Sequence, residues 1–290
     1  MTDIQQLIAQ LNNSATSEKA TNTLVEMGAV AVEPLLKQLN SSVQGERTLA
    51  IRVLGKINDP RVIPALMEHS MRDAVPVVRE AAITAVVGFK SDARVMDFLL
   101  QTVRNSAQQD IARMAAIRHV GKLSGADAAN ALWLEMLNDR SVTMMINAAY
   151  NLGNTKNPEF FEPMLKVLNR LTETDQGVAG VLGGLGRLGD KRALEPIAAF
   201  LQAKPVTVRA AAAHALAALG DVRALDLLAP LQNDRTVSGQ EDHGGPTYTL
   251  GSEVRHAMDV IRKANGLADV KTASDDKKSS DEKKPWWKVW

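Results

Sequence analysis

The feature of this sequence that most constrains its fold is an internal repeat with a period close to 32 residues. In six successive copies a small residue follows the apolar end of a first segment, at intervals of 33, 33, 32, 33 and 31 residues: Gly55, Gly88, Gly121, Gly153, Gly186 and Ala217. An earlier copy covers 17–40, and a final half-copy covers 252–266. A regular period of this length predicts stacked units that bury their apolar sides against one another.

Each copy has the same internal order. Apolar residues first recur at helical spacing, a Gly-containing turn leads to Asp-x-Arg, and a second apolar segment closes the copy. Aspartate favours the N-cap of a helix, and Pro60 suits a first helical turn. The Asp-x-Arg runs begin at Asp59, Asp92, Asp190 and Asp221. Two helices per copy, with an aromatic content of only 4%, predict an all-α fold and argue against a β-sandwich.

The copies resemble HEAT repeats, and more narrowly the short HEAT-like repeats of phycobilisome lyases. The run VTVRAAAAHALAALGDVRALDLLAPLQNDR at 206–235 shows the resemblance most clearly, and it extends over roughly 17–266. It implies an α-solenoid (α-α superhelix) of about seven to eight helix pairs. We therefore expect a solenoid over 1–269 with a polar loop insertion at 233–252, then a disordered charged tail at 270–290 with a Trp-rich end.

Motifs for chemistry are sparse in this chain. There is no cysteine, which removes disulfides and thiolate chemistry. None of the five histidines forms H-x-x-x-H or H-E-x-x-H, and the glycine pattern at 184, 186 and 189 follows no predicted strand. Among HEAT-like enzymes, deoxyhypusine hydroxylase uses His-Glu dipeptides as iron ligands, and this chain has no such dipeptide. We therefore expect no metal and no other cofactor.

Charge and hydropathy restrict the partners. The chain has 34 basic and 33 acidic residues, so its net charge of +1 does not favour binding to bulk nucleic acid. The start, MTDIQQLIAQL, lacks the basic region of a signal peptide, and no run of about 18 apolar residues predicts a membrane span. We expect a cytoplasmic protein.

A row of polar residues interrupts the apolar pattern of the first helices. Three residues before the small residue of each copy, the chain has Arg52, Ala85, Arg118, Tyr150, Gly183 and His214. A row that admits Arg, Tyr and His is not a core row. The HEAT resemblance implies that these first helices line a concave groove, so Arg52, Arg118, Tyr150 and His214 are predicted to contact a protein partner, and the excess of basic residues suits an acidic segment. For Arg47, Arg113 and Arg209 we expect pairing with acidic groups of the neighbouring copy.

Three irregular segments each leave two interpretations open. The insertion at 233–252, with His243 and Tyr248, is either a surface loop or a binding loop. The tail residues Trp286, Trp287 and Trp290 form a docking peptide for a partner or a membrane interface, or they fold back onto the chain. The glycines at 177–189 mark either a flexible joint or unusually close helix packing.

These observations favour a non-catalytic scaffold or adaptor that binds a protein partner in its groove. Two other classes stay open: a subunit that acts in bilin attachment or an oxidoreductase related to deoxyhypusine hydroxylase, and a HEAT-type DNA-binding protein. Bilins are attached in the lyase family to a cysteine of the substrate protein, so the missing cysteine is no objection. A bilin-dependent colour change, bound iron, or salt-dependent binding to duplex DNA would separate these classes.

Overall fold

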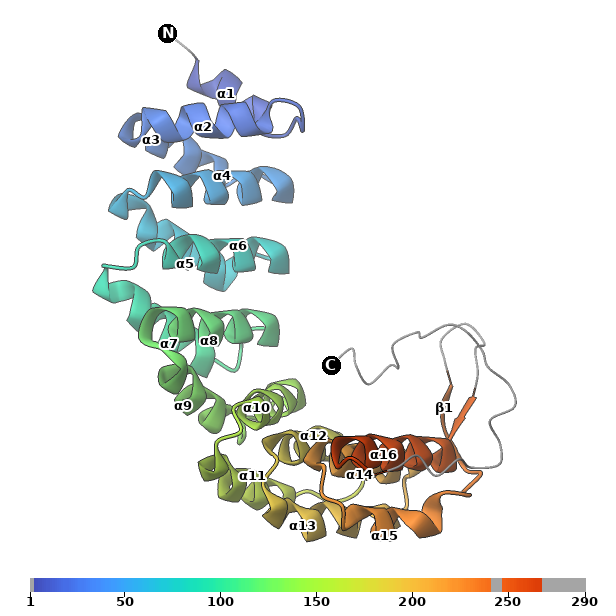
Figure 1. The fold of residues 1–290 in the computed structure, drawn as a ribbon. Helices are drawn as coiled ribbons and strands as arrows, with labels where there is room; N and C mark the ends of the chain where they lie inside the picture. The colour runs from blue at the N-terminus through green and yellow to red at the C-terminus, as the bar shows by residue number, and fades with distance from the viewer. Residues whose placement is uncertain (1–2, 241–246, 268–290) are drawn as a thin grey trace. The chain divides into compact units, whose positions relative to one another are not determined.

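The computed structural model describes residues 3–240 and 247–267. The chain forms two compact units, an N-terminal unit of residues 1–132 and a C-terminal unit of residues 133–290. Each unit is built from successive helix pairs (Figure 1). We call the first helix of each pair its A helix and the second its B helix. The predicted tail at 270–290 lies outside the described residues.

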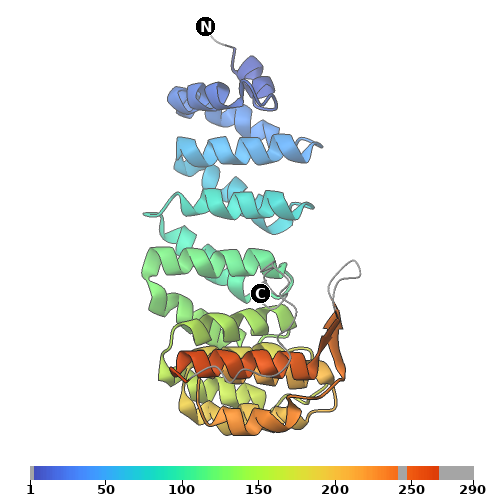
Figure 2. The same cartoon turned by 45° about the vertical axis from the view of Figure 1, so that its right-hand side comes forward.

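The N-terminal unit begins with α1 (Ile4–Gln10). Its A helices lie side by side in chain order, as both views show (Figures 1 and 2). The pairs are α2 (Ser17–Met27) and α3 (Ala29–Gln38), α4 (Gln44–Ile57) and α5 (Ile63–Arg72), α6 (Pro76–Val87) and α7 (Ala93–Arg104), and α8 (Asp110–Ser124) with α9 (Ala126–Met136), within which the unit ends. A short 3-10 helix, η1 (Pro60–Val62), leads into α5.

In the C-terminal unit, α12, α14 and the final helix α16 pack in succession. The pairs are α10 (Val142–Asn154) and α11 (Phe161–Leu168), α12 (Val178–Leu188) and α13 (Leu194–Ala198), and α14 (Val206–Leu219) and α15 (Ala224–Leu228), followed by α16 (Leu250–Ala264). Four 3-10 helices flank the B helices: η2 (Pro158–Phe160), η3 (Lys191–Ala193), η4 (Ala199–Gln202) and η5 (Ala229–Leu231). The predicted all-α solenoid of helix pairs is confirmed.

The insertion at 233–252 contains more structure than a loop. The strands β1 (Val237–Gln240) and β2 (Thr247–Thr249) form an antiparallel hairpin in which Gly239 pairs with Tyr248. Val237 and the run TYT at 247–249 are β-favouring and consistent with this pairing. The last residues of the insertion are the first turn of α16, where Thr249 and Ser252 form a capping box.

The Asp-x-Arg runs cap the B-helix segments as expected. In each run, the Asp Oδ1 accepts the backbone N–H of the residue two positions later at 3.0 Å: Asp59, Asp92, Asp190 and Asp221. The arginine at that position also donates from its guanidinium to the same carboxylate. This side-chain hydrogen bond lowers the pKa of Asp92 and that of Asp221 to about 2.

We expect Asp221→Asn to reduce the free energy of unfolding by about 1 kcal/mol near neutral pH, because a capping residue loses its charge. Asp221 is buried, and its folded-state pKa of about 2 lies below the unfolded value. Its contribution is therefore complete above about pH 4 and is lost as the pH falls through about 2. Urea unfolding at several pH values should show the two proteins converging in acid. The exposed Asp226 gives the control, Asp226→Asn, and a pH-independent difference for Asp221→Asn would contradict the assignment.

The glycine-rich helix α12 supports close packing rather than a joint. Gly184 and Gly186 are buried, and a side chain at either position would collide with backbone of a neighbouring A helix, at Ala149 on α10 and at Ala215 on α14. Gly180 faces the side chain of Ile146 on α10 in the same way. The small residues therefore let α12 approach the helices on both of its sides.

Candidate interaction surface

Helix starts and arginine contacts set the register of the A helices. The fourth residue of α4, α6 and α14 is an arginine that donates to a backbone carbonyl six residues earlier: Arg47 to Ser41 at 2.8 Å, Arg209 to Ala203 at 2.9 Å, and Arg79 to Asp73. Four residues of the predicted polar row are each the ninth residue of their helix: Arg52, Arg118, Tyr150 and His214. The ninth residue of α6 is Thr84, and the predicted Gly183 is the sixth residue of α12.

The inclusion of Ala85 in that row is wrong by one residue. Ala85 is buried with 8% exposure, whereas Thr84 is exposed. The error arose because the copies were aligned on their glycines. Gly55 lies inside α4, but Gly88 follows the end of α6, so equal glycine positions do not mean equal helix positions.

The two arginines of the row lie on exposed surface of the N-terminal unit. Arg52 is exposed on α4, and Arg118 on α8 has a 62% exposed side chain. Arg118 Nη2 is 4.0 Å from Glu80 Oε1 on α6, a distance at the limit of an ion pair between exposed groups. Both guanidinium groups are therefore accessible to a partner.

The other two residues of the row have neighbours within the C-terminal unit. The guanidinium of Arg187 on α12 lies over the Tyr150 ring, 4.6 Å from its centroid. His214 Nε2 is 2.9 Å from Glu253 Oε2 on α16, and Glu253 is only 2% exposed. Half-buried Tyr150 and His214 thus contribute to helix packing as well as to the surface.

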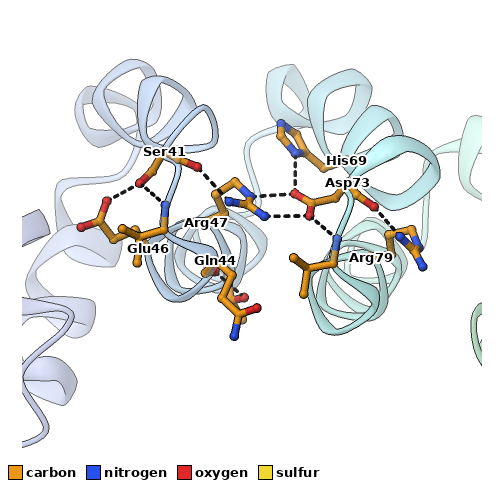
Figure 3. A network of polar contacts seen from close by, with 10 residues as sticks. Ser41, Gln44, Glu46, Arg47, His69, Asp73 and Arg79 are labelled. Carbon is orange, nitrogen blue, oxygen red and sulfur yellow. Dashed lines mark hydrogen bonds and ion pairs between the residues drawn. The ribbon is translucent and has the colours of Figure 1, made fainter.

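Arg47 joins two copies through a buried network rather than facing a groove (Figure 3). Its guanidinium donates to both oxygens of Asp73, at 2.7 and 2.8 Å, and His69 Nδ1 lies 3.5 Å from the same carboxylate. Burial acts to raise the pKa of Asp73, but hydrogen bonds from Arg47 and from the Val75 N–H outweigh it and lower the pKa. The hydrogen bond to Asp73 in turn raises the pKa of Arg47.

Each of the three arginines for which pairing is predicted has an acidic side chain beside it, although Asp234 lies in the same copy as Arg209, at 206–235. Arg47 pairs with Asp73, and Arg209 Nη2 lies 3.8 Å from Asp234. Arg113 is 1% exposed; it donates to the Val103 carbonyl at 2.8 Å and lies 3.5 Å from Asp110 of its own helix. These arginines therefore add little to the accessible positive charge of the A helices.

The structure also shows features that the sequence did not single out. An open hollow between α5 and α7 is lined by Met67, Met71 and Phe98. In addition, Val77 and Ile111 are large apolar residues, each 47% exposed, in the first turns of α6 and α8. In the sequence, Val77 and Ile111 each lie two positions before an arginine, Arg79 and Arg113. Helical periodicity alone would assign such apolar residues to the core, so it did not predict their exposure.

The remaining predicted contacts lie at the insertion and the tail. Tyr248 is half-buried on β2, and its carbonyl accepts a hydrogen bond from Ser238 Oγ at 3.2 Å. His243, Trp286, Trp287 and Trp290 lie outside the described residues. Within residues 3–240 and 247–267, no three or more acidic or His side chains gather as metal ligands. No helix in the described part of the chain is long and apolar enough to cross a membrane.

Comparison with known proteins identifies relatives of part of the chain. The family model for HEAT repeats matches residues 4–87, 32–118 and 164–239. Phycocyanobilin lyase subunit beta of Thermosynechococcus vestitus is 40% identical over 85 residues, which is 29% of this chain and 40% of that protein. The protein of the same name from a Nostoc species is 39% identical over 71 residues, which is 24% of this chain and 36% of that protein. The chain thus matches less than half the length of these relatives.

The solved structure of the Escherichia coli protein YibA aligns with 90% of this chain over 93% of the YibA chain, with a TM-score of 0.49 and 18% sequence identity.

Proposed function

Because the chain belongs to the HEAT-repeat family and shares 40% identity over 85 residues with a phycocyanobilin lyase subunit, we propose that it is a protein-binding subunit of the bilin-lyase type. That local identity is the observation that carries the proposal. The repeat alone does not, because one fold supports many functions. The name "subunit" also indicates that the relative acts together with another protein, and we extend this to the present chain.

In this proposal the A helices hold a protein partner. Arg52 and Arg118 are the accessible charges best placed to bind an acidic segment of that partner. Tyr150, with Arg187 over its ring, and His214, held by Glu253, form the corresponding surface of the C-terminal unit. Tyr248, His243 and the tail residues Trp286, Trp287 and Trp290 remain predicted further contacts.

The bilin-lyase reading takes precedence over a scaffold with no role in bilin chemistry. The relatives that support it are named as phycocyanobilin lyase subunits or as a bilin biosynthesis protein. Among residues 3–240 and 247–267 no cluster of metal-ligating side chains favours iron chemistry, and the net charge of +1 does not favour DNA binding. A scaffold function nevertheless remains part of the proposal, since the chain would act by holding a partner protein.

The test combines the full chain, purified together with the proteins that bind it, with phycocyanobilin and with apo-phycocyanin, the acceptor whose cysteine would receive the bilin. We expect the absorbance spectrum to change when the chain is mixed with the bilin, or with phycocyanin that already carries the bilin. We also expect covalently attached bilin, seen by fluorescence after denaturing electrophoresis, to appear faster than in the control. The same mixture with the heat-unfolded chain is the control. If the chain changes neither the spectrum nor the rate, and mass spectrometry of co-purified proteins finds none that carries a bilin, the proposal is wrong and a plain scaffold function stands.

A further inference from the structure

Three consecutive A helices of the N-terminal unit expose the same positions. Counted from the helix start, these are the second, the fifth or sixth and the ninth residues, and on α4 and α8 also the thirteenth; their spacing places them on one helix face, and on α4 the second residue is Gly45. On α8, for example, they are Ile111, Met114, Arg118 and Lys122. None of these four side chains is buried.

The amino-terminal half of this face is apolar. It consists of half-buried or exposed side chains that we call the apolar row: Leu49, Val77, Ala81, Ile111 and Met114. Val77 and Ile111 are each 47% exposed, although burial of such large apolar side chains would stabilise the fold. Apolar side chains that stay together at a surface are typical of an interaction site.

The carboxyl-terminal half of the face is basic. Four exposed side chains form what we call the basic row: Arg52, Lys56, Arg118 and Lys122. Glu80 on α6, whose side chain is 42% exposed, lies 4.0 Å from Arg118. The four cations, two on α4 and two on α8, give this half of the face a positive charge that is complementary to an acidic partner.

The two-row pattern is specific to the N-terminal unit. At the second and thirteenth positions of α10 the chain has Thr143 and Asn154, and on α14 it has Thr207 and Ala218. These four residues are exposed but are neither large and apolar nor charged. The large apolar residues at the second position of α6 and α8, and the lysines at the thirteenth position of α4 and α8, therefore do not follow from the repeat itself.

We propose that this face binds an amphipathic α-helix of a partner protein, with its apolar side on the apolar row and an acidic flank on the basic row. The inference rests on the proposed function in that it takes the A helices as the partner-binding surface. Ile111 and Arg118 are about 10 Å apart along the axis of α8, and neighbouring A helices are spaced by about 10 Å. A helix about 10 Å wide that lies across α4, α6 and α8 contacts both rows, whereas a single extended strand covers one.

The probe is a synthetic helical peptide of about 18 residues with Leu along one side and Glu along the flank. Its affinity for the full chain is measured by fluorescence anisotropy, beside a scrambled peptide of the same composition and a DNA duplex of similar charge. We expect the ordered peptide to bind about tenfold more tightly than the scrambled one, and more tightly than the duplex.

Two variants divide the surface. Arg52→Glu/Arg118→Glu should weaken the ordered peptide about tenfold and reduce the salt dependence of binding. Val77→Glu/Ile111→Glu should weaken it by a similar factor; acidic residues suit the first turn of a helix, so both helices are expected to form, as circular dichroism will check. The matched control is Thr143→Glu/Thr207→Glu, at the exposed second positions of α10 and α14 in the C-terminal unit, which should leave the affinity unchanged.

Equal binding of the two peptides, tighter binding of the duplex, or equal loss in the control would overturn the proposal. The peptide assay contains no bilin, so it fails or succeeds separately from bilin attachment. If the wild-type chain accelerates attachment but does not distinguish the peptides, the further inference is wrong and the lyase-type function stands. If the wild-type chain distinguishes the peptides but does not accelerate bilin attachment, the further inference stands and the lyase-type function is wrong.

Discussion

Replacing Asp73 with alanine is expected to lower the free energy of unfolding by about 3 kcal/mol, because loss of one member of a buried ion pair leaves the other charge uncompensated. The Asp73 side chain is only 3% exposed, and it accepts two hydrogen bonds from Arg47 and one from the Val75 N–H. Arg47 is 12% exposed and also donates to the Ser41 carbonyl, so in the variant its charge keeps some solvation and one hydrogen bond. We therefore expect a loss of stability at the lower end of the range for broken buried ion pairs. Urea unfolding near neutral pH measures it.

Two further proteins separate the network from a general effect of losing a carboxylate. Asp97→Ala removes an exposed acid on α7 of the same unit and should change stability by less than about 0.5 kcal/mol. Arg47→Met/Asp73→Ala removes both charges and should recover part of the loss. Because the pKa of Asp73 is lowered in the folded state, the difference from wild type should be present above the unfolded pKa and shrink as the pH falls through the lowered one. A loss that the double variant leaves unchanged would contradict the ion-pair explanation.

Gly184→Ala is expected to destabilise the C-terminal unit by about 3 kcal/mol, the upper part of the usual range for overpacking. A Cβ at this position would lie 2.6 Å from the Ala149 carbonyl oxygen and 2.8 Å from Met164 Cε. The first of these atoms is backbone, so α10 and α12 must separate to admit the methyl group. The gain of about 1 kcal/mol from helix propensity does not offset that separation. Thermal and urea unfolding of the two proteins provide the comparison.

The matched control is Gly45→Ala in α4, where a Cβ has no atom within 4 Å. There the change should stabilise the chain by about 0.5–1 kcal/mol, because alanine restricts the unfolded state and favours the helix. Opposite signs at the two glycines are the expected pattern. A neutral or stabilising Gly184→Ala would mean that α10 and α12 are not held this closely, and would restore the interpretation of this segment as a flexible joint.

The sequence predicted the helix pairs and their caps because both depend on residues close together in the chain. Asp59 and Asp221 cap from two residues away, a distance at which residue type and spacing are informative. The prediction was weaker for the polar row. Arg52 and Arg118 are exposed as expected, but alignment on glycines placed Ala85 in the row instead of Thr84. An error of one residue in the register of a helix is enough to exchange a surface position for a core position.

By itself, then, the sequence determined that this chain is a succession of helix pairs, since a period near 32 residues and apolar spacing within each helix are local properties that hold whatever the neighbours are. Only the tertiary structure decided what each polar side chain does. Arg47 and Arg52 are five residues apart on α4, yet one is buried against Asp73 and the other faces outward. His214 meets Glu253 across 39 residues of chain, including a hairpin that helical periodicity does not foresee. Such pairings depend on how far one copy is displaced against the next, and that displacement is set by the packing of whole helices.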